Sequence, residues 1–471
     1  MSHPRVLGWL MLFLVFLNEV PYLRPANSIY MEIPVLYQIY LDHPVVTTDS
    51  RNVPQGALFF ALRGDNFDGN HFAAQALADG AAYAVVDDPS VCTDGRFLLV
   101  EDTLETLQAL GRHHRQQFEI PVIAITGSNG KTTTKELVSA VLSSHYPTHF
   151  TRGNFNNHIG LPLTLLSMPP QTEVAVIEMG ANHQGEIELL CTLAEPTHGL
   201  ITNIGKAHLE GFGGIEGVKK GKSELYRYLA ADNGMAFINK NEVFLEELAA
   251  PIPKKLFYTK SDAPTVANEY YETQLLAADP FVRVAFLSEF GELVEVVSRL
   301  IGAYNFNNIM TAIALGKYFK VPAHKIKAAI EGYVPSNNRS QLIHLGEHTV
   351  ILDAYNANPD SMRQAILNLA AMEGAHKVAI LGDMLELGES GAEEHRRIAQ
   401  LAIDQGFDQV VLTGPAFAET ASEAGLRHFE NVDTLREWFI LQDFPPSLLL
   451  IKASRGMRME RLLLTVTNGS V

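Results

Sequence analysis

The segment that most limits how this chain can fold is residues 121–143, where an apolar strand, a glycine-containing loop and a helix are predicted to follow one another. The loop at residues 126–132 reads TGSNGKT. The backbone N–H groups of such a loop and the N-terminus of the helix can surround a chain of phosphates. Lys131 would then contact the β- and γ-phosphates, and the Thr132 hydroxyl would bind Mg²⁺. Because Ile125 replaces the usual first glycine, the sequence predicts a variant phosphate loop.

Two further apolar strands are predicted at residues 173–178 and 198–203, and each runs into a glycine-containing loop. Such strands are typical of an open parallel sheet, in which ligands gather at the carboxyl ends. Glu178 closes the first strand and His208 follows the second, so both are candidates for a magnesium site. On the residues alone, a solvated glutamate is equally favoured, and for His208 a surface histidine is favoured. Lys222, in a helix-like run, is likewise predicted to be solvated.

The N-terminal region begins with an apolar run, residues 7–17, that resembles the core of a signal peptide. The run is too short to predict a membrane span. We therefore interpret residues 1–30 as a start-site extension in preference to a short apolar leader. The first domain then begins at Met31, and it is predicted from short strands and a helix at residues 57–62, 84–87 and 72–80.

The C-terminal region predicts another α/β domain. After a helix at residues 305–319, residues 334–340 have the composition of a linker. Four strands separated by helical stretches follow, at residues 349–353, 377–381, 409–412 and 448–452. The predicted fold is α/β in three domains: a small α/β N-terminal domain, a central parallel-sheet phosphate-loop ATPase domain and a C-terminal Rossmann-like domain, at residues 31–118, 119–333 and 334–471.

Charge and cysteine content exclude several classes of protein. The 471 residues carry a formal net charge of −17, which would repel a polyphosphate backbone. No basic stripe with interleaved aromatic residues offsets this charge, so nucleic acid is not expected as a partner. The two cysteines, Cys92 and Cys191, lack metal-ligand spacing and form no disulfide framework. Both are predicted to be buried as small apolar side chains.

Polar residues gather in two other places. The loop at residues 353–362, DAYNANPDSM, carries more amide and carboxylate groups than a turn requires, and such a loop can recognise a small zwitterion. Asn305 and Asn308 lie three residues apart on one helix face. They could present amides to a base or a ribose, although helix capping is equally plausible.

Together these segments resemble the Mur ligase family, which shares a variant phosphate loop, a glutamate and a histidine near magnesium, and a mobile C-terminal domain. The resemblance extends from about Met31 to the end of the chain. It is carried by the motifs GNFNNHIG, EMGANH, HLEGFG and YNANP at residues 153–160, 178–183, 208–213 and 355–359. In the N-terminal domain, residues 48–51 and 67–72 match the part that receives a UDP moiety.

The resemblance implies an ATP-dependent ligase that forms an amide C–N bond by activating a carboxylate as an acyl phosphate. It implies two Mg²⁺ ions, one of them held through a carbamylated Lys222, with Thr132, Glu178 and His208 as further metal ligands. Lys131, Lys222, His208 and Glu178 are the expected catalytic residues. ATP is expected at Gly127, Ser128, Asn129, Gly130, Lys131, Thr132, Thr133, Asn305, Asn308, Arg339 and Asp353. Substrate is expected at Ser50, Arg51, Asn70, His71, Asn154, Asn156, Asn157, Tyr355, Asn356, Asn358 and Ser361.

Within the family, the motifs are most similar to members that join D-alanyl-D-alanine to UDP-N-acetylmuramoyl-tripeptide. These two substrates, a place in peptidoglycan precursor synthesis, a cytoplasmic monomer and no membrane partner are therefore implied. Another amino-acid-adding or folylpolyglutamate-type ligase remains an alternative, as does a phosphate-loop ATPase or kinase. The third residue of the tripeptide stays open. So does the role of Arg455, because residues 452–456 match the family only loosely.

Overall fold

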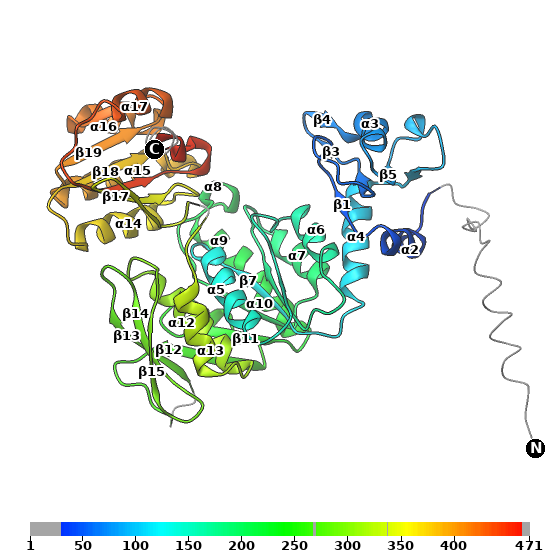
Figure 1. Cartoon of the computed structure of the whole chain (residues 1–471), viewed down its shortest axis with the longest axis horizontal. Helices are drawn as coiled ribbons and strands as arrows, with labels where there is room; N and C mark the ends of the chain where they lie inside the picture. Colours follow the sequence, from blue (N-terminus) through cyan, green and yellow to red (C-terminus); the bar gives the residue numbers. More distant parts are fainter. Residues whose placement is uncertain (1–29, 267–269, 337, 464–471) are drawn as a thin grey trace, which may run out of the picture. The chain divides into compact units, whose positions relative to one another are not determined.

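The computed structural model describes residues 30–266, 270–336 and 338–463 (Figure 1). The predicted extension therefore lies outside the described residues, apart from Tyr30. Two compact units make up the chain: one comprises the described residues up to Phe118 with Pro162–Met168, and the other comprises Glu119–Leu161 and the described residues from Pro169 onward. Over the described ranges, no helix combines the length and apolar character needed to cross a membrane.

The first unit is built on a parallel sheet of four short strands in the order β1-β2-β5-β6. Apolar side chains on one face of this sheet pack against α3. The predicted strand at residues 57–62 and the helix at residues 72–80 are confirmed with shorter bounds, and the strand predicted at residues 84–87 is confirmed one residue earlier. The elements are α2 (Ile33–Asp42), β1 (Val46–Thr47), β2 (Leu58–Phe60), β3 (Arg63–Gly64), β4 (Phe67–Asp68), α3 (Ala73–Ala78), β5 (Tyr83–Val86), β6 (Phe97–Leu99) and α4 (Thr103–Arg115).

The second unit contains a nine-stranded sheet in the order β15-β14-β13-β12-β11-β10-β7-β9-β8. All predicted strands of this region are present. The bounds are β7 (Val122–Thr126), β8 (Thr148–Phe150), β9 (Val174–Glu178), β10 (His198–Ile201), β11 (Met235–Asn239), β12 (Lys254–Lys260), β13 (Tyr271–Ala277), β14 (Arg283–Leu287) and β15 (Leu293–Val297).

The central sheet is parallel over most of its strands, as predicted, and β13, β14 and β15 pair antiparallel at one edge. Only a few residues connect these three strands, and a connection that short can join antiparallel but not parallel neighbours. The strands from β8 to β13 are parallel as expected. The phosphate loop and the loops after β8, β9 and β10 follow these parallel strands.

Helices of this region pack in two groups. Apolar side chains of α5 (Lys131–Ser143), α12 (Asn305–Tyr318) and α13 (Ala323–Gly332) join the main hydrophobic core of the sheet. A second group contains α7 (Glu186–Ala194), α9 (Ile215–Lys222) and α10 (Glu224–Ala231), which contact one another. These helices support loops at the carboxyl ends of the strands.

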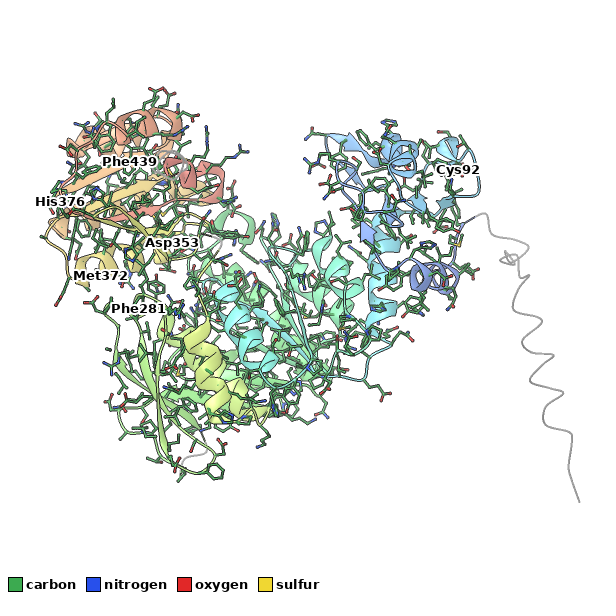
Figure 2. The ribbon with its side chains drawn as sticks, viewed as in Figure 1. Cys92, Phe281, Asp353, Met372, His376 and Phe439 are labelled. Atoms are coloured by element: carbon green, nitrogen blue, oxygen red, sulfur yellow. The ribbon has the colours of Figure 1, made fainter. Side chains whose placement is uncertain are left out.

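The remaining sheet has six strands in the order β16-β17-β21-β18-β19-β20, and only β16 runs antiparallel to its neighbour. Hydrophobic clusters containing Met372 and Phe439 cover its two faces (Figure 2), so the Rossmann-like prediction is confirmed. The bounds are β16 (Gln341–Leu345), β17 (His348–Asp353), α14 (Pro359–Ala371), β18 (Lys377–Gly382), α15 (Gly391–Asp404), β19 (Gln409–Thr413), α16 (Ala418–Ala424), β20 (Arg427–Phe429), α17 (Val432–Phe439) and β21 (Leu448–Lys452).

We propose that the second unit comprises two domains, residues 119–333 and 334–471, because it contains two separate sheets with mostly separate cores.

The two cysteines differ in exposure. Cys191 is buried as predicted, and burial raises the pKa of its thiol. Cys92 is exposed, so that prediction was wrong (Figure 2). It follows a single 3-10 turn, Pro89–Val91, in the loop between β5 and β6, where no element covers it.

Candidate active site

The phosphate loop connects β7 to α5, and two of its glycines are required by its backbone. Gly127 has φ 141° and Gly130 has φ 79°, which is left-handed backbone that favours glycine. A Cβ atom at Gly127 would also lie 2.0 Å from Thr202 Oγ1, and one at Gly130 would lie 2.6 Å from Asn308 Oδ1. The loop therefore joins β7 to the N-terminus of α5 as the sequence predicts, and its Ser128 and Asn129 N–H groups donate to Asn203.

Lys131 folds back over this loop. Its ammonium donates hydrogen bonds to the carbonyl oxygens of Gly127 at 2.6 Å and Ser128 at 3.1 Å. Burial lowers the pKa of Lys131 to about 8, and the charge of Arg339 acts in the same direction, whereas Glu178 opposes it. A polyanion bound in the loop would add negative charge beside Lys131, where Glu178 now acts as the negative charge.

Nucleotide binding is accordingly expected to take up a proton above pH 8. Lys131 is then largely neutral, and a triphosphate beside it stabilises the ammonium and raises its pKa. Calorimetric titration with a non-hydrolysable ATP analogue, in two buffers of different ionisation enthalpy, measures this uptake at pH 9. At pH 6.5 the lysine is already protonated, so its contribution should vanish. Equal uptake at both pH values would contradict the assignment.

Glu178, at the end of β9, offers a carboxylate suited to a hard cation. Its Oε1 accepts hydrogen bonds from Thr132 Oγ1 at 3.0 Å and Asn156 Nδ2 at 2.8 Å. Its Oε2 is buried and has no hydrogen-bond partner within the described part of the chain. A buried carboxylate oxygen without a partner is costly unless a ligand completes it. Together with the Thr132 hydroxyl, this oxygen fits magnesium.

Lys222 is completely buried at the end of α9, contrary to its solvated prediction from the residues alone. Its Nζ donates to the Ala181 carbonyl oxygen at 3.0 Å and lies 4.9 Å from the ring centroid of Phe212. Burial, followed by the charge of Lys131, lowers the pKa of Lys222 well below its usual value. A neutral amine can add CO2, so the surroundings of Lys222 fit the expected carbamylation.

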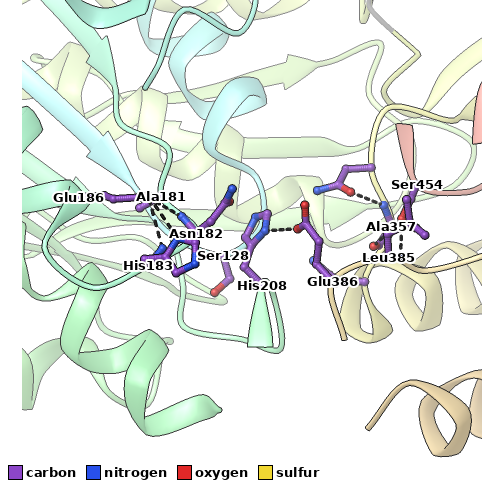
Figure 3. A network of polar contacts seen from close by, with 12 residues as sticks. Ser128, Ala181, Asn182, His183, Glu186, His208, Ala357, Leu385, Glu386 and Ser454 are labelled. Carbon is purple, nitrogen blue, oxygen red and sulfur yellow. Dashed lines mark hydrogen bonds and ion pairs between the residues drawn. The ribbon is translucent and has the colours of Figure 1, made fainter. Parts of the chain in front are cut away.

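His208 occupies left-handed backbone at the start of α8 (Leu209–Phe212), and its Nδ1 contacts the Glu386 carboxylate (Figure 3). The hydrogen bond lowers the pKa of Glu386, so this group is ionised at neutral pH. Among the described residues, no three His, Cys, Asp or Glu side chains cluster closely enough to hold a metal. Any metal bound here would therefore need oxygen ligands of other kinds, such as Thr132 or a carbamate.

The side chains of Asn305 and Asn308 on α12 form hydrogen bonds with other groups of the chain. Asn305 Nδ2 donates to the Ile301 carbonyl oxygen at 2.8 Å, and Asn308 Nδ2 donates to Asn305 Oδ1 at 2.8 Å. Thr134 Oγ1 donates to Asn308 Oδ1 at 2.9 Å, which ties α12 to α5. Both asparagines line the cleft, and their expected contact with adenine stays a prediction.

Charged residues at the ends of β17 and β21 face one another. Lys452 Nζ lies 2.5 Å from Asp353 Oδ2, and the two residues are register partners in adjacent parallel strands. The Arg339 guanidinium stacks 3.7 Å from the ring centroid of Tyr355. Its buried Nε has no hydrogen-bond partner within the described ranges. This guanidinium is placed to meet an anionic ligand.

The polar loop at residues 353–362 caps α14 and reaches the phosphate loop. Asn358 and Ser361 form a reciprocal capping box. Asn358 Nδ2 also donates to Asn129 Oδ1 at 2.8 Å. Part of this polarity thus serves the helix N-terminus, while Tyr355 and Asn356 line the cleft.

One cleft of about 810 Å³ brings most of the predicted residues together. Gly127 and Lys222 do not line it, and Arg455 lines it while pairing with Glu460 at 3.0 Å. The predicted lining residues are Ser128, Asn129, Gly130, Lys131, Thr132, Thr133, Asn154, Asn156, Asn157, Glu178, His208, Asn305, Asn308, Arg339, Asp353, Tyr355, Asn356, Asn358 and Ser361.

Four predicted substrate residues lie in the first unit. Arg51 is exposed and pairs with Asp49 at 2.8 Å. Asn70 is buried, and its Nδ2 donates to both Asp68 and Asp87. The roles predicted for these residues, and for Ser50 and His71, stay predictions.

Sequence reasoning missed several residues at the cleft or near it, of which Lys206 and Glu394 are not among the lining residues. The Lys206 backbone N–H donates to Asp360 Oδ2 at 2.8 Å, and its ammonium lies 2.6 Å from Glu394 Oε1. Glu386 and Lys452 were also missed. The opposite charges that end the strands at residues 349–353 and 448–452 were a readable signal for Lys452. Nothing local pointed to Lys206, Glu386 or Glu394.

The cleft combines a phosphate loop with a buried carboxylate oxygen that has no partner in the described residues, and residues of a Rossmann-like sheet line it as well. These features define a phosphate-loop nucleotide-binding enzyme. Three family models match the chain in succession: "Mur ligase family, catalytic domain" over residues 44–115, "Mur ligase middle domain" over 125–316, and "Mur ligase, glutamate ligase domain" over 338–455. The chain belongs to the Mur ligase family.

Similar proteins span almost the whole chain. UDP-N-acetylmuramoyl-tripeptide–D-alanyl-D-alanine ligase of Bacillus subtilis is 36% identical over 431 residues, covering 89% of this chain and 92% of that protein. The Escherichia coli ligase of the same name is 36% identical over 423 residues, with the same coverage. MurF from Acinetobacter baumannii superposes with a TM-score of 0.79 at 33% identity, covering 90% and 93% of the two chains. MurF from Thermotoga maritima in complex with ADP superposes at 0.76, with 26% identity and 90% and 97% coverage.

Proposed function

We propose that this protein is an ATP-dependent ligase that joins D-alanyl-D-alanine to UDP-N-acetylmuramoyl-tripeptide in peptidoglycan precursor synthesis. The observation that carries the proposal is a single cleft in which the Lys131 phosphate loop, the Glu178 carboxylate and the loop at residues 353–362 meet. The names of the relatives supply the substrates. Neither the family nor these relatives favour the ATPase, kinase or folylpolyglutamate-type alternatives.

Two magnesium ions are proposed as cofactors. Glu178, Thr132 and His208 would hold them, together with the carbamate formed when the neutral Lys222 amine adds CO2. When bound, magnesium would offset the negative charge on the phosphates of ATP. The partnerless Oε2 of Glu178 and the lowered pKa of Lys222 support this donor set.

In the first step, the tripeptide carboxylate attacks the γ-phosphorus of ATP, the bond to the ADP oxygen breaks, and an acyl phosphate forms. Lys131 would move from the carbonyl oxygens of its own loop onto the β- and γ-phosphates. There its charge opposes the repulsion between carboxylate and triphosphate. Arg339, across the cleft, would add a second positive charge.

In the second step, the amine of D-alanyl-D-alanine attacks the acyl carbon. The tetrahedral intermediate loses a proton from nitrogen and expels phosphate, leaving the amide. The loop at residues 353–362 would hold the dipeptide, with Tyr355 and Asn356 facing the cleft. The contact between Asn358 and Asn129 would keep this loop beside the phosphates.

The test measures phosphate released from ATP with UDP-N-acetylmuramoyl-tripeptide, with and without D-alanyl-D-alanine, and identifies the product by mass spectrometry. Release that needs the dipeptide and yields the UDP-pentapeptide supports the proposal. Phosphate release that does not depend on either substrate would instead indicate an ATPase. Parallel assays with lysine- and diaminopimelate-containing tripeptides decide the third residue.

We further propose that the enzyme acts as a cytoplasmic monomer without a membrane or nucleic-acid partner. In support, the net charge of −17 disfavours nucleic acid. Light scattering on a sizing column should give the mass of a single chain. A dimer mass at working concentration would contradict this.

The Lys206–Glu394 pair is expected to support dipeptide binding. Lys206→Met should raise the KM for D-alanyl-D-alanine about fivefold, corresponding to about 1 kcal/mol for a partly exposed ion pair. The KM for ATP should change little. Exchanging the charges in Lys206→Glu with Glu394→Lys should recover part of the loss. Arg396, on the same helix as Glu394, forms an exposed pair with Glu423 of α16, so Arg396→Met is the matched control and should behave as wild type.

A further inference from the structure

His208 and Glu386 come from different sheets and are held together by two contacts (Figure 3). His208 follows β10 and Glu386 follows β18. His208 Nδ1 contacts Glu386 Oε2, and the Glu210 backbone N–H donates to the Glu386 carbonyl oxygen at 3.4 Å. Both residues occupy left-handed backbone, with φ 53° and 65°. Non-glycine residues adopt this conformation only when their surroundings impose it.

The segment that carries Glu386 is anchored by successive backbone groups. The Met384 N–H donates to His395 Nε2 at 3.0 Å, and the Leu385 N–H donates to Ser454 Oγ at 2.9 Å. Ser454 and His395 are both buried. Glu386 therefore approaches His208 from a fixed support, although its own side chain is 54% exposed.

We propose that Glu386 is a positioning residue that orients His208 toward the magnesium site. The carboxylate accepts a hydrogen bond from the Nδ1–H of the imidazole, which orients the ring and leaves Nε2 available to a cation. Metal-binding histidines are commonly held in this way by a carboxylate. This inference rests on the proposed function, which makes His208 a metal ligand.

The same support continues to the loop that would hold the dipeptide. Ser454 Oγ donates to the Ala357 carbonyl oxygen at 3.3 Å, between Asn356 and Asn358 (Figure 3). One hydroxyl thus links the Glu386 segment to the 353–362 loop. The segments that follow strands of the C-terminal sheet would thereby both orient His208 and hold D-alanyl-D-alanine, and Ser454 connects the two.

The experiment measures Mn²⁺ binding to the full chain by electron paramagnetic resonance, with a non-hydrolysable ATP analogue present. Glu386→Ala is expected to weaken Mn²⁺ binding about 10- to 100-fold, the usual effect of removing a group that orients a metal ligand. Glu386→Gln should stay within about threefold of wild type, because its amide oxygen can accept the same hydrogen bond. Glu389→Ala, an exposed glutamate in the next turn, is the matched control and should bind as wild type.

His208→Ala and the double variant test whether Glu386 acts through His208. The double variant should bind Mn²⁺ no more weakly than His208→Ala alone, because residues that act through one group are not additive. A merely structural role of Glu386 would add its own loss. Thermal unfolding of each variant within a few degrees of wild type shows that the fold is retained.

Mn²⁺ affinity of Glu386→Ala within twofold of wild type overturns the inference. Unchanged affinity in His208→Ala overturns it as well, since His208 would then bind no metal. Neither result touches the proposed function, which is judged by dipeptide-dependent phosphate release from the wild-type chain. The two failures are therefore distinguishable.

Discussion

Replacing Lys131 with methionine is expected to lower kcat/KM for ATP on the order of 10³-fold, or about 4 kcal/mol of transition-state stabilisation. Methionine keeps an apolar stem of similar length and removes the ammonium. The loop glycines and the N-terminus of α5 remain in place, so nucleotide can still bind. The loss should therefore fall mainly on kcat, because the lysine charge matters most while the γ-phosphoryl group transfers.

Steady-state phosphate release with both substrates measures the effect, and binding of an ATP analogue is measured separately. Lys320→Met, an exposed lysine just beyond the end of α12, serves as control and should keep wild-type rates. A Lys131→Met variant with unimpaired kcat would show that the phosphates do not lie over this loop. In that event the nucleotide assignment of the cleft is wrong.

Lys222→Ala is expected to reduce kcat by about 10³-fold as well, for a different reason. The alanine variant lacks the carbamate that would hold magnesium, and a lost metal ligand costs several kcal/mol of charge stabilisation. Because the change leaves a buried space, formate or acetate should enter it and restore part of the activity. Lys222→Met fills that space and should not respond. Lys220→Ala, an exposed neighbour, should leave the rate unchanged.

Carbon dioxide supplies an independent readout for Lys222. Wild-type activity should fall in buffer depleted of CO2 and return when bicarbonate is added, whereas Lys222→Ala should ignore both treatments. Burial lowers the pKa of Lys222 well below its usual value, which favours the unprotonated amine that reacts with CO2. If wild type is indifferent to bicarbonate and no small acid rescues Lys222→Ala, then Lys222 acts as an amine or a cation and the carbamate is excluded.

The sequence located the phosphate loop and its flanking strand and helix to within a residue or two. The pattern is local: an apolar run, glycines with left-handed backbone and a lysine at the first position of α5 lie within 13 residues of chain, so neighbouring residues specify the geometry. The Rossmann-like strands were equally legible, because buried parallel strands are continuous apolar runs. In the antiparallel edge β13–β15, the strands β13 and β15 were missed because they are partly exposed and polar residues interrupt their apolar ones. The apolar run of β14, residues 284–287, is largely buried and was overlooked.

Single-residue environments were predicted less well. On the residues alone, Lys222 was predicted to be a solvated lysine within a charged run. In the structure its side chain is buried, and its ammonium donates to the Ala181 carbonyl oxygen. Asn305 and Asn308 were predicted to contact a ligand or to cap a helix. The structure adds a hydrogen bond from Thr134 of α5 to Asn308, and the ligand contact stays a prediction. A residue type restricts what a side chain can do, but its burial depends on which face of a helix meets its neighbours.

The sequence by itself therefore determined the family, the α/β architecture and the residues of the phosphate loop, because these depend on contacts between positions close together in the chain. Only the tertiary structure decided which distant groups pair. His208 and Glu386 are 178 positions apart, and Lys206 and Glu394 are 188 apart. No periodicity links such positions. They meet because chain segments that follow parallel strands of two different sheets come together, and a polar group on one segment pairs with a carboxylate on the other.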